Sequence, residues 1–151
     1  MKVFLMRHGE AEYYAAEDAL RALTAAGQQQ SVTVAQQLAA SWHTLDLVLV
    51  SPYLRAQQTW SAIQAVCPLG PEVITLPELV PEADPATACA AILAYGEIHQ
   101  AQHILVVSHM PLLGYLLAEF IPGEIPLLFA TSSISVIDFT PKPALIERIS
   151  A

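Results

Sequence analysis

An arginine, a histidine and a glycine follow one another directly after the first apolar run of the chain. Arg7-His8-Gly9 comes after Val3–Met6, a segment that predicts a short buried strand. The Arg7 guanidinium is a planar fork of donors that suits a phosphate, and a neutral imidazole such as His8 can act as a nucleophile. Gly9 would let the backbone turn sharply and come close to a ligand. Because ligands bind at the carboxyl ends of strands in open α/β sheets, these residues predict a phosphate site.

Two later apolar runs lead to residues of the same kinds. The run 46–50 is followed, one helical turn later, by Arg55, and the run 103–107 is followed by His109. If the three strands are parallel neighbours, two arginines and two histidines converge at one edge of the sheet. The N-termini of helices at that edge would add oriented backbone N–H groups for an anion.

The segments between these runs contain capping signals that predict helices. Each predicted helix begins at a capping residue or at proline, over Thr24–Ser41, Ser51–Val66, Asp84–Ile98 and from Met110-Pro111 onward. A short strand is expected near residues 73–76, followed by a rigid loop at Pro77-Glu78-Leu79. The segments 135–139 and 144–149 alternate in polarity, which predicts a hairpin or an antiparallel edge.

These elements together predict an α/β fold, namely a three-layer α/β/α sandwich. Three strand-then-helix units with short connections favour a mainly parallel central sheet, with an antiparallel edge near the C-terminus. Apolar residues make up 54% of the chain and charged residues 13%, which fits a sheet covered on both faces. No segment is rich enough in Gly, Ser or Pro to divide the 151 residues, so we expect a single domain over 1–151.

Composition excludes several classes of function. A net charge of −8 argues against a nucleic-acid surface, and the apolar stretch 112–121 is too short to cross a membrane. Cys67 and Cys89 make neither a disulfide framework nor a zinc motif, so we expect free thiols and no metal. The first apolar run is too short for a signal peptide, and we expect a cytoplasmic protein.

The motifs in combination resemble the histidine phosphatase superfamily, which includes the phosphoglycerate mutases. In chain order they are Arg7-His8-Gly9-Glu10-Ala11, Leu23-Thr24 with Gly27, Ser51-Pro52 with Arg55-Ala56 and Gln58-Thr59, and Ser108-His109 with Pro111 and Gly114. The resemblance is narrower to the SixA-type phosphohistidine phosphatases, and the residues that carry it are Arg21-Ala22-Leu23-Thr24, Leu76-Pro77-Glu78-Leu79, Gly114-Tyr115-Leu116 and Thr131-Ser132-Ser133. It runs from residue 2 to about residue 139 and implies a metal-independent hydrolase without a cofactor.

The resemblance also implies a role for each matching residue. His8 would be the nucleophile that takes the phosphoryl group as a phosphohistidine intermediate. Arg7, Arg55 and His109 would hold the phosphoryl oxygens, with Gly9 beside them in the binding site. Two nearby arginines would disfavour the protonated form of His8.

Two further residues have alternative interpretations. Arg21 contacts either the phosphate or substrate, or a partner within its loop. Glu78 stands at the position of the general acid in the mutase-like branch, but it is equally consistent with a cap or ion pair in that loop. His43, His99 and His103 match no motif, and we expect structural roles for them.

The expected substrate follows from the absence of room for a lid insertion. A shallow, open site favours a phosphohistidine on a partner protein, either a phosphotransfer domain or a phosphotransferase-system protein. One alternative is a small-molecule phosphomonoesterase of the same superfamily. Another is a non-catalytic module that binds phosphate, although a pure binder needs no nucleophile.

Overall fold

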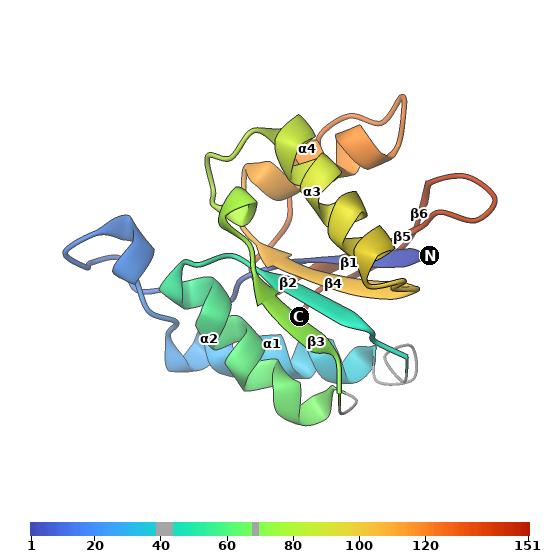
Figure 1. Ribbon diagram of the computed structural model, residues 1–151. Coiled ribbons are helices and arrows are strands. Elements are labelled where there is room, and N and C mark those ends of the chain that lie inside the picture. The colour runs from blue at the N-terminus through green and yellow to red at the C-terminus, as the bar shows by residue number, and fades with distance from the viewer. Residues whose placement is uncertain (39–43, 68–69) are drawn as a thin grey trace.

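The computed structural model describes residues 1–38, 44–67 and 70–151, and it contains one six-stranded sheet (Figure 1). The strand order is β3-β2-β4-β1-β5-β6. The strands are β1 (Lys2–Arg7), β2 (Leu47–Val50), β3 (Glu72–Thr75), β4 (His103–Ser108), β5 (Ile134–Asp138) and β6 (Ala144–Ile149). The first four are parallel, and β5 and β6 pair antiparallel at one edge. The predicted mainly parallel sheet with an antiparallel C-terminal edge is confirmed.

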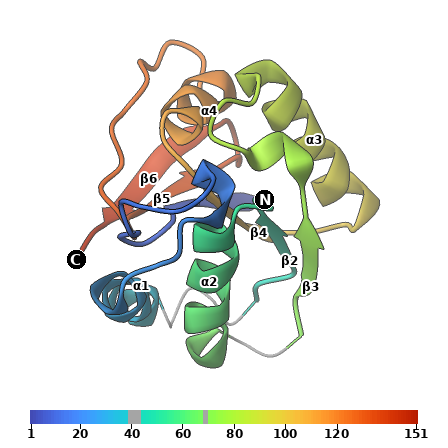
Figure 2. The same ribbon diagram turned by 90° about the vertical axis from the view of Figure 1, so that its left-hand side faces the viewer.

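Helices cover both faces of the sheet, which gives the three predicted layers (Figures 1 and 2). On one face lie α1 (Ala25–Gln37) and α2 (Leu54–Ile63), and on the other lie α3 (Pro85–Ile98) and α4 (Leu112–Phe120). Short 3-10 helices also occur at η1 (Asp18–Leu20), η2 (Gln64–Val66) and η3 (Pro77–Leu79). None of the helices in the described ranges is long and apolar enough to span a membrane.

The core consists of two apolar clusters, one on each side of the sheet. Along β1, Val3 and Leu5 belong to the cluster that packs against α3 and α4, whereas Phe4 and Met6 belong to the cluster under α1 and α2. This alternation follows from the two-residue period of a strand. Burying each such side chain contributes roughly 1.5–3 kcal/mol, so the central strands are held rigidly and fix the positions of the residues at their ends.

The helix starts agree with the sequence at two positions and differ at a third. Thr24 caps α1 by accepting a hydrogen bond from the Gly27 N–H, and Asp84 caps α3 in the same way. The predicted cap at Ser51 is wrong, because α2 begins at Leu54 after Tyr53. Ser51 instead extends the strand ladder, since its N–H donates to the Val107 carbonyl.

Two predicted features fall partly or wholly beyond the described residues. The predicted helix over 24–41 is shorter in the structure, where α1 ends at Gln37 and Leu38 is its C-cap. Residues 39–41 of that prediction, and His43, lie outside the described ranges.

The predicted loop at Pro77-Glu78-Leu79 is one turn of 3-10 helix, η3.

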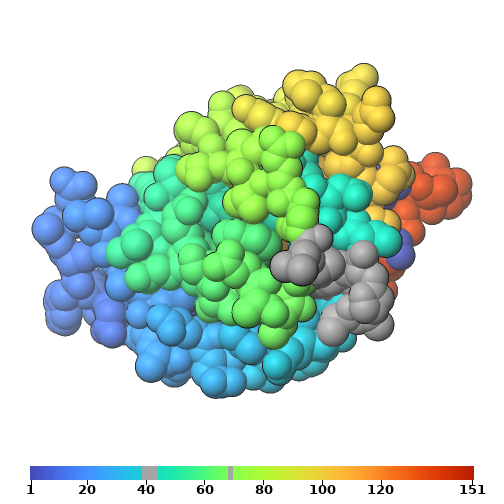
Figure 3. Space-filling view, turned by 60° about the horizontal axis from the view of Figure 1, so that its bottom comes forward, coloured from blue at the N-terminus to red at the C-terminus, as the bar shows by residue number. Residues whose placement is uncertain are grey.

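The loop between β1 and α1 projects from the carboxyl edge of the sheet. Figure 3 shows it in blue at one end of the molecule, next to α2. It contains η1, and an isolated antiparallel bridge between Ala11 and Leu23 joins the beginning of the loop to its end. The loop therefore stands beside the ends of the parallel strands.

Candidate active site

The ends of β1, β4 and β2 meet at one edge of the sheet, as the sequence predicts. Arg7 at the end of β1 is opposite Ser108 at the end of β4, and the His8 N–H donates to the Ser108 carbonyl over 3.0 Å. The residues that directly follow β1 and β4 are His8 and His109, and the centroids of their rings are 5.0 Å apart. Parallel pairing alone thus brings the two imidazoles together.

His8 is buried, and its hydrogen bonds define which nitrogen is free to react. Its Nδ1 lies 2.7 Å from the Gly9 carbonyl, which can only accept, so Nδ1 carries the proton. The Nε2 lone pair faces Arg55, whose Nε–H donates to it over 3.3 Å. Burial, together with the nearby cations Arg55, Arg7 and Arg21, lowers the pKa of His8 to about 4 against the opposing effect of the Gly9 hydrogen bond. His8 is therefore neutral at pH 7, with Nε2 as a nucleophile.

Arg55 is only 4% exposed, although it carries a full charge. It lies in the first turn of α2, and both of its terminal nitrogens bind Asp18 of η1. Nη1 donates to the Asp18 carbonyl over 2.7 Å, and Nη2 donates to Oδ2 over 3.1 Å. The guanidinium also lies 5.1 Å from the centre of the Tyr53 ring. Its Nε is the nitrogen that remains directed at His8.

Arg7 is held by the segment that precedes β5. Its Nη1 donates to the Phe129 carbonyl over 2.7 Å. Its Nε is buried without a hydrogen-bond partner among the described residues, and burial and the Arg55 charge lower its pKa from the usual value. A buried donor of this kind is costly unless it is satisfied, and an anionic oxygen next to His8 would satisfy it.

His109 is buried next to His8 and is held by a hydrogen bond to Ser51. Its Nε2 lies 2.7 Å from the Ser51 hydroxyl oxygen, which also accepts from the Tyr53 N–H over 3.3 Å. In the tautomer in which the Ser51 hydroxyl donates to Nε2, the ring proton is on Nδ1. That Nδ1 is buried and has no partner in the described ranges. Burial, then His8 and Arg55, lower the pKa of His109 to about 2.

Gly9 is required by close packing against α1. A Cβ at this position would lie 2.6 Å from the Gly27 carbonyl oxygen and 2.8 Å from the Ser31 hydroxyl. The Gly9 N–H donates to Thr59 over 3.0 Å, which ties the loop to α2. Its backbone is not in the left-handed region, so close approach to a helix, and not a sharp turn, explains the glycine.

Arg21 has the partner within its loop that one interpretation of the sequence predicts, and contact with the phosphate or substrate stays a prediction. It lines a cavity of about 500 Å³ together with Arg7 and His8, and the other lining residues are Glu10, Ala11, Glu12, Tyr13, Thr24 and Thr131. Its Nε donates to the Glu12 carbonyl over 2.7 Å, and its Nη1 pairs with Asp18 Oδ1 over 3.1 Å. A loop ion pair thus holds Arg21 at the wall of the cavity.

Glu78 follows the carboxyl end of β3, at the same edge of the sheet, but forms no hydrogen bond or ion pair with His8 or His109. Among the described residues it has no hydrogen bond or ion pair, and its Oε2 is buried without a partner. The Ser108 hydroxyl donates to the Leu79 carbonyl over 2.8 Å and so fixes the turn that carries Glu78. Neither the cap nor the ion pair considered from the sequence is present.

The remaining histidines in the described ranges have structural partners. His99 pairs with Glu72 over 2.9 Å, and the His103 ring bonds the Thr44 hydroxyl over 2.9 Å. Across the described part of the chain, no group of three or more His, Cys, Asp or Glu side chains could hold a metal ion.

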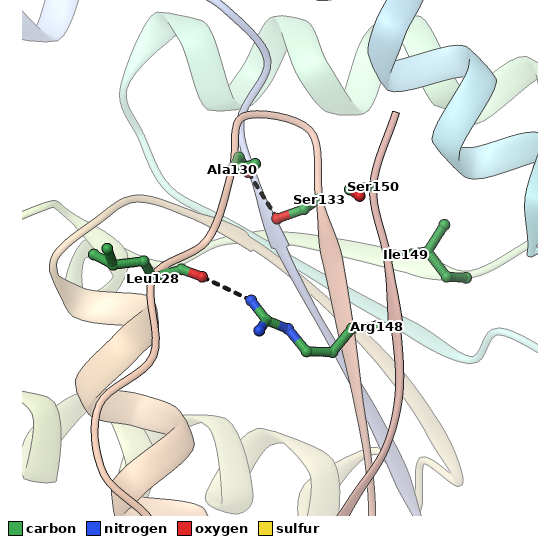
Figure 4. Close-up of a pocket in the computed structure, with 6 residues that line it drawn as sticks. All are labelled: Leu128, Ala130, Ser133, Arg148, Ile149 and Ser150. Carbon is green, nitrogen blue, oxygen red and sulfur yellow. Dashed lines mark hydrogen bonds between the residues drawn. The ribbon is translucent and has the colours of Figure 1, made fainter.

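A second cavity, of about 300 Å³, lies beside β5 and β6 (Figure 4). Its lining residues are Leu128, Ala130, Ser133, Arg148, Ile149 and Ser150. Arg148 donates to the Leu128 carbonyl over 2.7 Å, and Ser133 donates to the Ala130 carbonyl over 2.7 Å. The lining contains no imidazole, carboxylate or thiol, so it offers no general base to activate the hydroxyls of Ser133 and Ser150.

Comparison with known proteins agrees with this arrangement. The family model of the histidine phosphatase superfamily (branch 1) matches residues 3–80. The phosphohistidine phosphatase SixA of Escherichia coli (strain K12) is 42% identical over 135 residues, which cover 89% of this chain and 83% of that protein. A SixA homologue of Haemophilus influenzae is 34% identical over 143 residues, covering 89% and 86%.

The fold matches as well as the sequence does. A solved structure of the protein histidine phosphatase SixA complexed with tungstate superimposes with a TM-score of 0.91 at 38% identity, covering 99% of this chain and 97% of that one. The sequence motifs and the strand order both indicate this family. So does the sheet edge that holds Arg7, His8, Arg55 and His109. The chain belongs to the histidine phosphatase superfamily and, within it, to the SixA type.

Proposed function

We propose that this chain is a phosphohistidine phosphatase that acts on a partner protein through a phosphoryl intermediate on His8. The observation that carries the proposal is the neutral, buried His8, whose Nε2 lone pair faces the Arg55 guanidinium at 3.3 Å. The similarity to SixA phosphatases, at 42% and 34% identity, supports the substrate class.

The first step transfers the phosphoryl group to the enzyme. His8 Nε2 attacks phosphorus, the bond from phosphorus to the substrate nitrogen breaks, and its electron pair returns to the substrate ring. That ring leaves as neutral imidazole when its other nitrogen carries a proton, with an ordinary pKa of about 6.5. Arg7, Arg55 and His109 hold the three phosphoryl oxygens in line, so positioning and electrostatics supply the catalysis.

The second step is hydrolysis of the phosphoenzyme. Phosphorylated on Nε2 and protonated on Nδ1, the His8 ring carries a positive charge that the Gly9 carbonyl stabilises over 2.7 Å. Water attacks phosphorus, the bond to Nε2 breaks, and its electron pair restores the neutral ring. Phosphate leaves with the oxygen and protons of the water, and no metal or cofactor takes part.

Glu78 is dispensable for this substrate in our proposal, because a protonated ring needs no further acid. An alkoxide leaving group does need one, and Glu78, whose Oε2 is buried without a partner among the described residues, is our candidate for that acid. Glu78→Gln should therefore lower turnover of a phosphomonoester and spare turnover of phosphohistidine. Loss of phosphohistidine turnover in this variant would refute the dispensable acid.

The protein substrate is supported by the surroundings of the cavity. Tyr13 lines it, and the next residue, Tyr14, is 93% exposed on the loop between β1 and α1. Large exposed aromatic side chains beside a site are typical of protein contacts. The partner in this proposal is a phosphotransfer domain or a phosphotransferase-system protein in the cytoplasm, and residues 1–151 act as a single domain without a lid.

A small-molecule phosphomonoesterase is the second candidate. The cavity of about 500 Å³ at His8 favours it, because small-molecule sites have volumes of roughly 300–1,000 Å³. Rates on sugar phosphates or nucleotides would then exceed the rate on a phosphohistidine protein.

The decisive experiment mixes the enzyme with a radiolabelled phosphohistidine phosphotransfer domain and quenches the reaction within milliseconds. We expect acid-labile, base-stable label on His8 that then decays to free phosphate. His8→Ala serves as the control and should acquire no label. If the donor keeps its label, the protein-substrate proposal fails and small phosphoesters become the substrates to examine. If they are also unchanged, a phosphate-binding module remains.

A further inference from the structure

Asp18 binds the two arginines that stand on either side of it, and it uses every acceptor it has. Its Oδ2 accepts from Arg55 Nη2 over 3.1 Å, and its Oδ1 accepts from Arg21 Nη1 over 3.1 Å. Its backbone carbonyl accepts from Arg55 Nη1 over 2.7 Å. One residue of η1 thus joins a buried cation of α2 to a cation on the wall of the cavity.

Because of this contact, the N–H donors of Arg55 point in two directions, toward Asp18 and toward His8. Both terminal nitrogens face Asp18, and the Nε–H is the donor that faces His8. A guanidinium is rigid and planar, so fixing its two terminal nitrogens also fixes the direction of its third. Without Asp18, a buried charge would lose its carboxylate partner and would be free to turn.

The contact contributes geometry more than stability. The Asp18 side chain is 55% exposed, and ion pairs with an exposed member stabilise a fold by little. Placement of Arg55 matters far more, because misplacing a catalytic group by about 1 Å can cost a hundredfold in rate.

We propose that Asp18 is a positioning residue that aligns Arg55 on His8 and holds Arg21 over the same phosphoryl group. The inference rests on the phosphatase function proposed above. Asp18 touches neither the substrate nor the attacking nitrogen, and it acts through the two arginines.

A competing interpretation is that the Asp18 carboxylate imitates a phosphoryl group and must leave before the substrate binds. The backbone carbonyl argues against this, since the 2.7 Å contact of an uncharged oxygen with Nη1 is shorter than the carboxylate contact with Nη2. The His8-facing Nε is also not among the nitrogens that Asp18 occupies. Blocking and positioning predict opposite changes in rate, so mutation separates them.

The test compares Asp18→Asn with the neighbouring control Glu17→Gln, which removes one negative charge from the exposed side chain of the preceding residue. Free phosphohistidine is the substrate, and inorganic vanadate and orthophosphate are the inhibitors. Vanadate resembles the transition state and orthophosphate resembles the product, so a positioning residue affects vanadate binding more.

We expect Asp18→Asn to lower kcat/KM by about 30-fold and to weaken vanadate binding by about the same factor. Orthophosphate binding should weaken by about threefold, and the thermal midpoint should stay within about 2 °C of wild type. Glu17→Gln should match the wild type in all four measurements. An unchanged or higher kcat/KM in Asp18→Asn would overturn the proposal, and higher activity with tighter orthophosphate binding would establish the blocking role.

The wild type and His8→Ala are assayed alongside, so that failure of the function is separate from failure of this inference. A wild type that does not hydrolyse phosphohistidine refutes the proposed substrate. Vanadate and orthophosphate titrations by calorimetry still test Asp18 in that case, because they need no turnover. If Asp18→Asn weakened the binding of vanadate and of orthophosphate by the same factor, a selective role of Asp18 in the transition state would be refuted.

Discussion

Two arginines of this molecule, Arg55 in the candidate active site and Arg148 in the cavity beside β5 and β6, each donate to a backbone carbonyl over 2.7 Å, yet the two cations differ in what they can do. Arg55 is 4% exposed and faces a neutral imidazole, whereas Arg148 is exposed at the sheet edge in the cavity of Figure 4. Charges interact far more strongly where water is excluded. Burial beside a nucleophile, and not the presence of a guanidinium, makes the first cavity a candidate active site.

The second cavity supports the first through the backbone. Arg148 binds the Leu128 carbonyl and Arg7 binds the next one, at Phe129, each over 2.7 Å. The Arg148 guanidinium also lies 5.8 Å from the centre of the Phe129 ring. Two arginines from opposite ends of the chain thus hold successive carbonyls, and the exposed one helps to fix the segment on which the other rests.

The largest expected change in turnover comes from replacing the nucleophile, His8. His8→Ala should lower turnover by more than about a thousandfold, because no other residue in either cavity replaces Nε2. Steady-state rates and the thermal midpoint are measured together, and the fold should be kept. Undiminished activity in a folded His8→Ala protein would overturn the whole assignment.

The arginines give the next largest contrast. Arg55→Ala should cost roughly 3 to 4 kcal/mol of transition-state stabilisation in kcat/KM, on the scale of an oxyanion donor. Arg148→Ala should change kcat/KM by less than about threefold, because its effect reaches the site only through the backbone. Equal losses in the two variants would show that burial does not distinguish the cavities.

The two buried histidines of the candidate active site, His8 and His109, make stability depend on pH. Burial lowers the pKa of His8 to about 4 in the folded protein, against about 6.5 in an unfolded chain. The unfolded state therefore binds more protons at acidic pH, and stability present above pH 6.5 is lost as pH falls toward 4, by up to about 3 kcal/mol for His8.

Chemical denaturation at a series of pH values measures this effect. His109, whose pKa is lowered to about 2, should add to the loss below pH 6.5. Removing the titrating group in His8→Ala should flatten the curve between pH 6.5 and 4. An equally steep curve in that variant would mean that other groups are responsible.

The smallest effect concerns the surfaces next to the cavities. Tyr14 on the projecting loop is 93% exposed, and Leu128 at the second cavity is 83% exposed. Tyr14→Ser should raise KM for a phosphohistidine protein by about threefold, whereas KM for free phosphohistidine should stay unchanged. Leu128→Ser should change neither value, and a larger effect of Leu128 would move the docking surface to the C-terminal edge.

The sequence predicts the strand ends well because they depend on local patterns and on one topological rule. Apolar runs identify β1, β2 and β4, and parallel pairing then brings His8, His109 and Arg55 together. Thr24 and Asp84 cap helices through hydrogen bonds to residues three positions later. Such local contacts can be predicted from the residue types alone.

The features that the sequence does not predict depend on contacts between distant segments. Asp18 lies 37 residues from Arg55, in an acidic loop where nothing distinguishes it from its neighbours. Ser51 reads as a helix cap, but its hydroxyl contacts His109, 58 residues away. The close crossing of Gly9 and α1 likewise depends on how a loop meets a helix, which no local pattern encodes.

The position of β1 between β4 and β5 has a consequence for the order in which the chain is made. His8 leaves the ribosome before the strands on either side of β1, which are synthesised roughly a hundred residues or more later. At roughly 5–20 residues per second, the delay is on the order of ten seconds. During vectorial synthesis the imidazole therefore remains an ordinary, solvated histidine, and it becomes a nucleophile with a lowered pKa only when nearly the whole domain has emerged.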